Sequence, residues 1–341
     1  MKKKIAIIFG VTGQDGYYLT KLLIKKNYVI HGIKRRSSSV PTKRIDKFLN
    51  QKNFHVHYGD LTDTASIHNL IKIIKPDEIY NLAAQSHVSV SFKNPVYTTQ
   101  VGTLGSLAIL EAIRHHKKDI RFYQASSSEM YGGASKEMLN EESQFDPKSP
   151  YAASKVFAHN MTSIYRESYD MFCVNGILFN HESPMRGETF VTRKITRAVG
   201  RIKLGLQSKL TLGNLEASRD WGFSGDYVDG MWRMLQHDKP DDFVLATGKS
   251  ITVKEFAELA FENQGLNYED YVTTSQRYYR PNEVDYLLGD YSKAKSELDW
   301  KPKTNIKQLV DMMVEEDLLL AKREKVLISE GLLKPTWEHS L

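Results

Sequence analysis

The sequence has almost no cysteine and no long run of apolar residues. Cys173 is its single cysteine, so an internal disulfide is excluded and a reducing compartment is expected. No apolar run approaches the roughly 18 residues that a membrane-spanning helix needs. The basic start at Met1–Lys4 leads only into Ile5–Phe9, which is too short for the apolar region of a signal peptide. We therefore expect a cytoplasmic protein with no membrane partner.

The composition is that of an ordinary globular protein. Hydrophobic residues make up 41% and charged residues 26% of the 341 residues, which excludes disordered and fibrous classes. Positive charge is concentrated at the start, because the first 50 residues hold 12 Lys/Arg and 2 Asp/Glu while the remainder is slightly acidic. A local basic cluster suits a small anionic ligand, and the alternative is a solvated lysine-rich face. No nucleic-acid partner is predicted.

Short apolar runs alternate with helical patterns along the first half of the chain. Strands are predicted at 5–9, 29–33, 55–58, 78–82, 121–126 and 171–178, and helices at 17–26, 63–74, 97–116 and 151–169. This alternation predicts an α/β fold: a Rossmann-type, doubly wound parallel sheet with helices on both faces. After about residue 180 we expect short, irregularly spaced elements. The predicted division is a cofactor-binding domain with the catalytic residues over 1–180 and a smaller mixed α/β substrate-binding region over 181–341, with some segments crossing back.

Three glycines at intervals of three follow the first predicted strand. Gly10, Gly13 and Gly16 form G-x-x-G-x-x-G between a strand and a helix, one residue longer than the common G-x-G-x-x-G pattern. Glycine there permits a tight turn and lets the backbone approach a pyrophosphate, and the helix N-terminus offers free N–H groups to phosphates. The pattern predicts a dinucleotide site; the alternative is a purely structural turn.

The end of the second predicted strand indicates which nicotinamide dinucleotide is bound. An acidic residue there would hold the ribose hydroxyls of NAD, but the sequence reads Lys34-Arg35-Arg36-Ser37-Ser38. Guanidinium groups and hydroxyls suit a 2′-phosphate, because arginine offers forked donors and a fixed charge. We predict NADP as the cofactor, against the alternative of a solvated basic loop. Asp60, after the third predicted strand, is placed to accept from the adenine amino group.

Tyr151 and Lys155 form a Y-x-x-x-K pattern at the start of a predicted helix. A spacing of four places both side chains on one face. An ammonium beside the phenol, together with the positive nicotinamide, is predicted to lower the pKa of Tyr151 toward neutrality. Ser126-Ser127-Ser128 ends the fifth predicted strand, and active residues gather at the carboxyl ends of parallel strands. With the glycine loop, this pattern resembles the extended short-chain dehydrogenases/reductases that act on sugar nucleotides.

Longer motifs make the resemblance narrower. They run from residue 10 to about 302 and are similar to those of the GDP-mannose 4,6-dehydratases. The motifs are Gly10-Val11-Thr12-Gly13-Gln14-Asp15-Gly16, Arg35-Arg36-Ser37-Ser38, Asn81-Leu82-Ala83-Ala84-Gln85-Ser86-His87-Val88, Ser127-Ser128-Glu129-Met130-Tyr131-Gly132, Ser149-Pro150-Tyr151, a long block over 180–196, Leu212-Gly213-Asn214, Arg219-Asp220-Trp221-Gly222 and Arg280-Pro281-Asn282-Glu283-Val284-Asp285.

The resemblance implies roles for individual residues. The implied catalytic residues are Ser127, Glu129, Tyr151 and Lys155. The implied NADP contacts are Gly10, Val11, Thr12, Gly13, Gln14, Asp15, Arg35, Asp60, Leu61, Leu82, Ala83, Ala84, Gln85, Ser86, Tyr97, Lys155, His181 and Arg186. The implied GDP-sugar contacts are Asn180, Lys194, Asn214, Arg219, Arg280 and Glu283. The family often has Thr at the position of Ser127, which keeps the hydroxyl. A homotetramer is also implied, with the 35–38 loop reaching a neighbouring subunit's cofactor.

The implied reaction is the 4,6-dehydration of a GDP-hexose, most simply of GDP-D-mannose to GDP-4-keto-6-deoxy-D-mannose. Oxidation at C4 acidifies the C5 hydrogen, Glu129 removes it, and the 6-hydroxyl leaves as water with acid help from the Glu129/Ser127 neighbourhood. Hydride then returns to C6, so NADP is unchanged overall. A 4-epimerase or 4-reductase would need no C5 base, and intact Tyr151, Lys155 and Glu129 argue against a non-catalytic NADP-binding regulator. His55, His57, His115 and His116 lack a Cys or carboxylate cluster, so no metal site is predicted.

The loop after Glu129 departs from the family pattern. It reads Gly132-Gly133-Ala134-Ser135, where relatives carry a larger Lys-Val-Gln stretch after the first glycine. Phe223-Ser224-Gly225 likewise stands where a His-containing stretch is usual. Smaller side chains beside C6 would leave room for a substituent, which makes GDP-D-glycero-D-manno-heptose an alternative substrate. The alternative is that this loop points to solvent, so that its departure from the family pattern does not affect the substrate.

Overall fold

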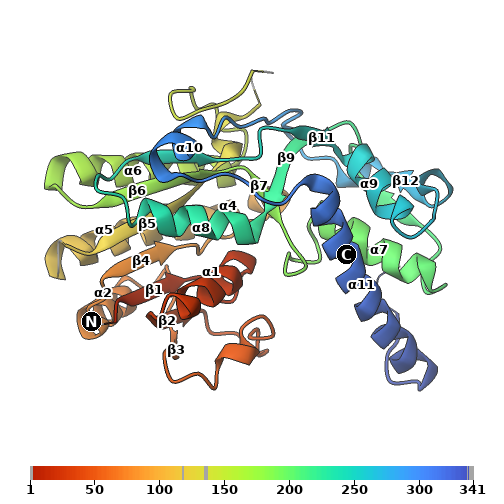
Figure 1. Cartoon of the computed structure of the whole chain (residues 1–341), viewed down its shortest axis with the longest axis horizontal. Coiled ribbons are helices and arrows are strands. Elements are labelled where there is room, and N and C mark those ends of the chain that lie inside the picture. The colour runs from red at the N-terminus through yellow and green to blue at the C-terminus, as the bar shows by residue number, and fades with distance from the viewer. Residues whose placement is uncertain (1–2, 117–118, 134–136, 336, 338–341) are drawn as a thin grey trace.

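The computed structural model describes residues 3–116, 119–133, 137–335 and 337, and its largest element is a seven-stranded sheet (Figure 1). The strand order is β10-β6-β5-β4-β1-β2-β3, and every neighbouring pair is parallel. Its strands are β1 (Ile5–Phe9), β2 (Val29–Lys34), β3 (Phe54–Tyr58), β4 (Glu78–Asn81), β5 (Arg121–Ser127), β6 (Cys173–Leu178) and β10 (Asp242–Leu245). The order reverses between β1 and β4, so the predicted doubly wound α/β fold is confirmed.

Strand β1 supplies apolar side chains to both faces of this sheet. Ala6 and Ile8 pack into one core with helices α1 (Gln14–Lys25) and α8 (Ser224–Met234). Ile7 and Phe9 pack into a second core with α2 (Thr64–Ile74) and α5 (Leu104–His116). The period of two along a strand produces this division, and a strand buried on both faces is apolar at every position.

The single helix predicted over 97–116 is two helices, α4 (Pro95–Gly102) and α5, separated at Thr103. A Cβ at Gly102 would lie 2.4 Å from Ser154 Oγ, and a Cβ at Gly105 would lie 2.6 Å from Leu61 Cβ. The two glycines therefore let α4 approach α6 (Pro150–Tyr169) and let α5 approach the segment after β3. A short helix, α3 (Val88–Lys93), precedes them and was not predicted.

The prediction of short elements after residue 180 holds for several strands but is wrong for the helices. Helices α7 (Val191–Lys203), α9 (Val253–Glu262) and α11 (Ile306–Ser329) pack around a separate core, at the right of Figure 1. Apolar residues at Ile195, Val199 and Ile202 already give α7 a helical period in the sequence. Two small sheets accompany these helices: β11-β9-β7 (Ser250–Thr252, Ser218–Phe223 and Asn180–Glu182) and β12-β8 (Val272–Thr274 and Leu210–Leu212). The short helices η1 (Asp46–Phe48), η2 (Ser128–Tyr131), η3 (Tyr268–Asp270), η4 (Gln276–Tyr278) and α10 (Ser292–Leu298) complete the elements described here.

Part of the chain beyond residue 181 packs with the large sheet, across the predicted boundary. Helix α8 packs against α1, and β10 pairs with β6, so residues 224–245 lie with the first half of the chain. This is a crossing of the kind that the sequence prediction allowed, and the boundary at 180 stays a prediction. Cys173 is fully buried in β6, as its apolar neighbours predict.

Among the described residues, no helix is apolar enough over a sufficient length to cross a bilayer. The same part of the chain holds no group of three His, Cys, Asp or Glu side chains that could bind a metal ion. His57 Nε2 lies 2.9 Å from His31 Nδ1, and the two rings are stacked. The His31 ring also lies 5.0 Å, centroid to centroid, from that of His55.

Candidate active site

The glycine loop between β1 and α1 is shaped for a close backbone approach. Gly10 has φ +82°, and a Cβ there would lie 2.9 Å from the backbone nitrogen of Ala83. A Cβ at Gly16 would lie 2.4 Å from the carbonyl oxygen of Val11. Gly13 is the N-cap of α1 and brings no side-chain cap to the first N–H groups of that helix. The loop therefore fits the pyrophosphate of a dinucleotide, held by backbone N–H groups.

The side chains of Gln14 and Asp15 connect this loop to the second half of the chain. Gln14 donates to the carbonyl oxygen of His181 at 3.0 Å and accepts from Ser183 Oγ at 2.7 Å. Asp15 Oδ2 lies 2.9 Å from His181 Nε2, and its Oδ1 accepts from Ser224 Oγ at 2.7 Å. The predicted cofactor residues Gln14, Asp15 and His181 are therefore brought together, and Asp15 and His181 form a partly buried ion pair.

This ion pair predicts a pH-dependent stability. Burial opposes ionisation of Asp15, but His181 outweighs it and lowers the pKa of Asp15 from 3.8 to about 2. Burial likewise opposes charge on His181, yet Asp15 raises the pKa of that imidazole above its ordinary value. The contribution of Asp15 to the free energy of unfolding is present above pH 3.8 and is lost as the pH falls toward 2. The contribution of His181 to the free energy of unfolding is present below pH 6.5. It is lost as the pH rises through the raised pKa of that imidazole.

We expect Asp15→Asn to lower the free energy of unfolding most between about pH 4 and pH 6.5, and less at about pH 9. Urea unfolding of both proteins at about pH 3, 5.5 and 9 measures this. Asp63→Asn is the control, because Asp63 is the exposed N-cap of α2 and should give a small difference at each pH. A loss for Asp15→Asn that does not vary with pH would contradict the coupling.

Helix α6 begins where it does because Ser149 caps it and Pro150 occupies its first position. Ser149 Oγ accepts from the backbone N–H of Ala152 at 3.1 Å. Tyr151 therefore lies in the first turn and Lys155 one turn later, with Lys155 Nζ 5.8 Å from the centroid of the Tyr151 ring. Lys155 is buried and donates to the carbonyl oxygen of Ala125 at 2.6 Å, which brings α6 to the carboxyl end of β5.

The pKa values of this pair differ from the prediction made for the tyrosine. Burial raises the pKa of Tyr151 to about 12, and the hydrogen bond with Ser127 opposes this only in part. Glu129 also raises that pKa, because its negative charge disfavours a phenolate. Burial lowers the pKa of the Lys155 ammonium to about 8. The protein's own groups therefore do not by themselves make Tyr151 acidic, and the prediction, which also counts the positive charge of the bound nicotinamide, stays a prediction.

Glu129 lies in η2, directly after β5, within a cluster of four charged side chains. It is 6% exposed, and its Oε1 lies 3.2 Å from Arg280 Nη1. Glu283 Oε1 lies 3.8 Å from Arg280 Nε and 3.5 Å from Arg219 Nη2. Two carboxylates thus balance two guanidinium groups. The structure brings together Glu129 and three of the six predicted sugar-nucleotide residues, from segments far apart in the sequence.

Two other predicted sugar-nucleotide residues contact different neighbours. Lys194 Nζ, on α7, donates to the carbonyl oxygen of Thr211 at 2.8 Å and lies 3.8 Å from the centroid of the Tyr278 ring. Asn214 Oδ1 accepts from the backbone N–H of Glu216 in the turn after β8. These contacts place both residues in the second region of the chain. Asn180 differs again, since no described residue hydrogen-bonds its buried Oδ1, which is therefore available to a ligand.

The remaining predicted cofactor residues follow the carboxyl ends of β2, β3 and β4. Arg35 is exposed and donates to the Tyr97 hydroxyl, and its guanidinium lies 5.6 Å from that ring's centroid. Asp60 Oδ1 accepts from the N–H and hydroxyl of Thr62 at 2.9 Å and 2.8 Å, so the turn after β3 already uses this oxygen. Leu61 is buried, against the position of Gly105.

The side chain of Gln85 holds the loop over 82–86, which follows β4. Gln85 Oε1 accepts from the N–H of His87 at 2.8 Å, and its Nε2 donates to Thr98 Oγ1 at 3.2 Å. This holds the loop that also carries Ala84 and Ser86, and the backbone of Leu82 and Ala83 lies beside Gly10. Arg186 has its Nε 3.1 Å from Glu182 Oε2 and its guanidinium over the Phe190 ring, which in turn contacts the ring of His87 at the end of this loop.

A family described as GDP-mannose 4,6 dehydratase matches residues 7–313 of this chain. The chain belongs to the GDP-mannose 4,6-dehydratase family. It is 57% identical over 339 residues to GDP-mannose 4,6 dehydratase 2 of Arabidopsis thaliana, covering 96% of this chain and 91% of that protein. Family members are nucleotide-sugar dehydratases, which confirms the resemblance seen in the motifs.

Solved structures with the same fold are more distant in sequence. A dTDP-glucose 4,6-dehydratase from Bacillus anthracis, in complex with NAD, has a TM-score of 0.81 at 20% identity and covers 97% of this chain and 100% of its own. RMD from Pseudomonas aeruginosa, complexed with NADPH, has a TM-score of 0.77 at 22% identity and covers 93% and 100%. At this identity the likeness establishes the Rossmann-type fold alone.

The enlarged pocket predicted beside C6 is not supported. Gly132 and Gly133 have φ +66° and +68°, and a Cβ at Gly132 would lie 1.8 Å from the carbonyl oxygen of Asp146. A Cβ at Gly133 would lie 2.8 Å from Val284 Cγ1. These glycines permit a tight, packed turn and do not open space. Ala134 and Ser135 lie outside the described residues. The heptose alternative is therefore not favoured, in agreement with the family membership.

Sequence reasoning missed Arg193, which fixes the loop that carries Arg186. Arg193, on α7, is 4% exposed and forms an ion pair with Asp317 of α11 at 2.7 Å. Its Nη1 donates to the carbonyl oxygens of Pro184 and, at 3.0 Å, Arg186. The partners Arg193 and Asp317 are 124 positions apart, and no local pattern connects them.

Proposed function

We propose that this protein converts GDP-D-mannose to GDP-4-keto-6-deoxy-D-mannose, with NADP as the cofactor. The observation that carries the proposal is the buried carboxylate of Glu129, placed directly after β5 and close enough to Tyr151 to influence its ionisation. A carboxylate base beside a Tyr–Lys pair is what proton removal at C5 requires once C4 is a ketone. The membership in the dehydratase family supports the same reaction.

The chain's own groups divide the work in the proposed reaction. Tyr151 receives the proton of the sugar O4, and Lys155 supplies the neighbouring positive charge that favours the phenolate. Bound NADP⁺ supplies the hydride acceptor for C4 and, once reduced, the donor for C6. Glu129 takes the C5 proton, and Arg280, whose Nη1 lies 3.2 Å from Oε1, holds that carboxylate in place by an ion pair. Ser127 lies close enough to the Tyr151 hydroxyl to lower its pKa, and the Glu129/Ser127 pair delivers the proton with which the 6-hydroxyl leaves as water.

The nicotinamide dinucleotide fits the residues that would hold it. The uncapped N-terminus of α1 and the glycine loop suit the pyrophosphate, and distant solved structures of the same fold were determined with NAD or NADPH. The preference for NADP rests on Arg35, whose exposed guanidinium lies at the end of β2 against Tyr97. The predicted homotetramer, the cytoplasmic location and the division at residue 180 stay predictions.

We expect Arg35→Asp to weaken NADP binding by roughly tenfold to a hundredfold, since the substitution removes a charge-assisted hydrogen bond and adds repulsion toward a phosphate. Affinity for NAD should change by less than about threefold, because NAD has no 2′-phosphate. Titration calorimetry with both dinucleotides measures the two effects. Lys43→Asp makes the same charge change at an exposed residue of the following segment and is the control. Equal affinity of the unaltered protein for NAD and NADP would overturn the cofactor assignment.

The proposed reaction is tested by mass spectrometry of GDP-mannose incubated with the protein and NADP. The product should be lighter by one water, with no net change in the cofactor. A product of unchanged mass would instead indicate a 4-epimerase and would overturn the dehydratase assignment.

A further inference from the structure

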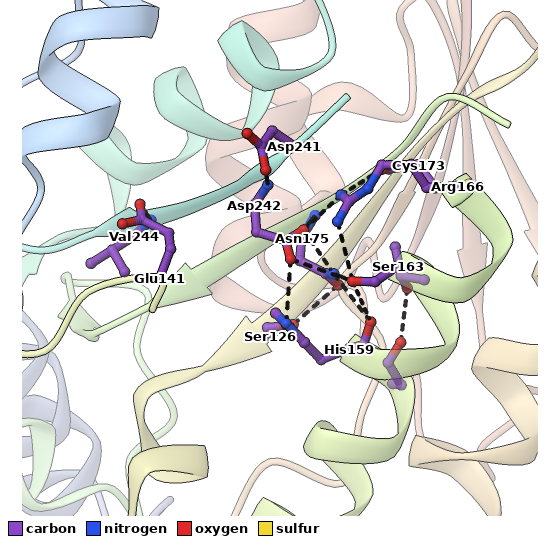
Figure 2. A network of polar contacts seen from close by, with 12 residues as sticks. Ser126, Glu141, His159, Ser163, Arg166, Cys173, Asn175, Asp241, Asp242 and Val244 are labelled. Atoms are coloured by element: carbon purple, nitrogen blue, oxygen red, sulfur yellow. Dashed lines mark hydrogen bonds and ion pairs between the residues drawn. The ribbon is translucent and has the colours of Figure 1, made fainter. Parts of the chain in front are cut away.

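A polar network centred on Asp242 contacts α6 from its middle to its C-terminal half, beyond the first turn that carries Tyr151; Figure 2 draws this network. Asp242 begins β10, and its carboxylate receives hydrogen bonds from two neighbouring elements. Arg166 Nη1, on α6, donates to Oδ1 at 2.8 Å, and Asn175 Nδ2, on β6, donates to the same oxygen at 3.0 Å. Ser163 Oγ, also on α6, lies 3.4 Å from Oδ2. One carboxylate therefore joins the edge strand, its neighbouring strand and the catalytic helix.

His159 extends this network to β5. Its Nε2 lies 3.4 Å from Asp242 Oδ2, and its Nδ1 lies 3.2 Å from Ser126 Oγ. Ser126 Oγ also donates to Asn175 Oδ1 at 3.3 Å, so the serine connects the imidazole of His159 with the amide of Asn175. Ser126 is only 3% exposed. The contacts from Ser126 through His159 to Asp242 thus connect β5, α6 and β10 inside the protein, away from solvent.

The spacing along α6 connects this network to the active site. Lys155, His159 and Ser163 follow one another at intervals of four, so they lie on one face of the helix. Lys155 donates to the carbonyl oxygen of Ala125, and His159 contacts the next residue, Ser126. The helix is therefore fixed to two consecutive residues of β5, and one turn further along it is fixed to β10. Since an α-helix rises about 1.5 Å per residue, a slip of one residue would break both attachments to β5.

We infer that His159 and Asp242 are positioning residues, which hold α6 so that Tyr151 and Lys155 meet the substrate; the inference rests on the proposed dehydratase function. Neither side chain is placed to touch the reacting atoms, and both act through the helix. We expect substitution of either residue to lower the rate of the chemical step more than it weakens substrate binding. A displacement of the helix on the order of 1 Å can cost up to about a hundredfold in rate.

The test compares three substitutions on α6. His159→Phe keeps a planar ring and removes both nitrogens, so kcat should fall about tenfold or more while KM changes less than about twofold. His159→Gln keeps a donor that can reach Asp242 and should restore most of kcat. Thr162→Val is the control, since Thr162 is equally buried and its hydroxyl donates at 2.8 Å only to Ala158 of its own helix. Its kcat should stay within about twofold of the unaltered protein.

A second measurement does not depend on turnover. The pKa of Lys155, about 8 because of burial, should move up toward its ordinary 10.5 in His159→Phe when measured by NMR of labelled lysine. An unchanged kcat and an unchanged Lys155 pKa in His159→Phe would overturn the inference, as would an equal loss in Thr162→Val. If His159→Phe does not fold, Asp242→Asn takes its place with the same expected results. Absence of dehydration by the unaltered protein would overturn the proposed function instead, and the Lys155 measurement would still decide the positioning role.

Discussion

Glu129→Gln should stop the reaction halfway, after oxidation at C4 and before loss of water. The amide keeps the size of the side chain and a hydrogen-bond acceptor for Arg280, but it cannot take the C5 proton. Dehydration should slow by about 10²–10⁴-fold, the usual contribution of a positioned general base. The reduced cofactor should then accumulate, because Tyr151 and Lys155 are unaltered and oxidation proceeds.

Absorbance of the reduced nicotinamide and mass spectrometry of the sugar nucleotide measure the two halves of this result. Glu142→Gln is the matched control, since Glu142 is an exposed carboxylate in the segment between η2 and α6. It should dehydrate GDP-mannose at the normal rate. A Glu129→Gln protein that also does so would show that the base is another residue.

Tyr151→Phe should block the reaction one step earlier. The substitution removes only the hydroxyl that takes the O4 proton, so neither reduced cofactor nor dehydrated product should form at more than about 10⁻² to 10⁻⁴ of the normal rate. Binding of the GDP-sugar should change little, because the charged cluster of Arg219, Arg280 and Glu283 is intact. The two variants are therefore distinguished by whether reduced cofactor appears.

Stopped-flow absorbance after mixing with GDP-mannose follows cofactor reduction directly. Tyr165→Phe serves as the control: it removes a hydroxyl from the same helix, one that bonds Glu111 outside the site. Tyr165→Phe should reduce the cofactor at the normal rate, although the lost hydrogen bond should cost about 0.5–1.5 kcal/mol of stability. Normal cofactor reduction by Tyr151→Phe would contradict its role as the base at O4.

Local patterns in the sequence predicted six strands of the large sheet and the glycine loop, but not the edge strand β10. β-branched runs such as Ile5–Phe9 identify buried parallel strands, and the glycine trio fixes the turn that follows. The spacing of Tyr151 and Lys155 predicts their shared face, and Pro150 with Ser149 marks the helix start. These features depend on residues close together in the chain.

The parts that sequence reasoning missed depend on residues far apart in the chain. The pairing of Asp15 with His181, of Glu129 with Arg280 and of Arg193 with Asp317 follows from how separate segments pack, which no spacing reveals. Burial by distant elements likewise raises the pKa of Tyr151, an effect that the spacing of Tyr151 and Lys155 does not reveal. The division of 97–116 into α4 and α5 likewise reflects contacts of Gly102 and Gly105 with other segments.

The measurement that tests the central claim most directly uses GDP-mannose carrying deuterium at C4. If the hydride removed from C4 is the one returned to C6, the product should be lighter by one water and should carry the deuterium in its C6 methyl group. Mass spectrometry gives the first result, and proton and deuterium NMR of the product gives the second. A product of unchanged mass, or a dehydrated product without deuterium at C6, would contradict the account.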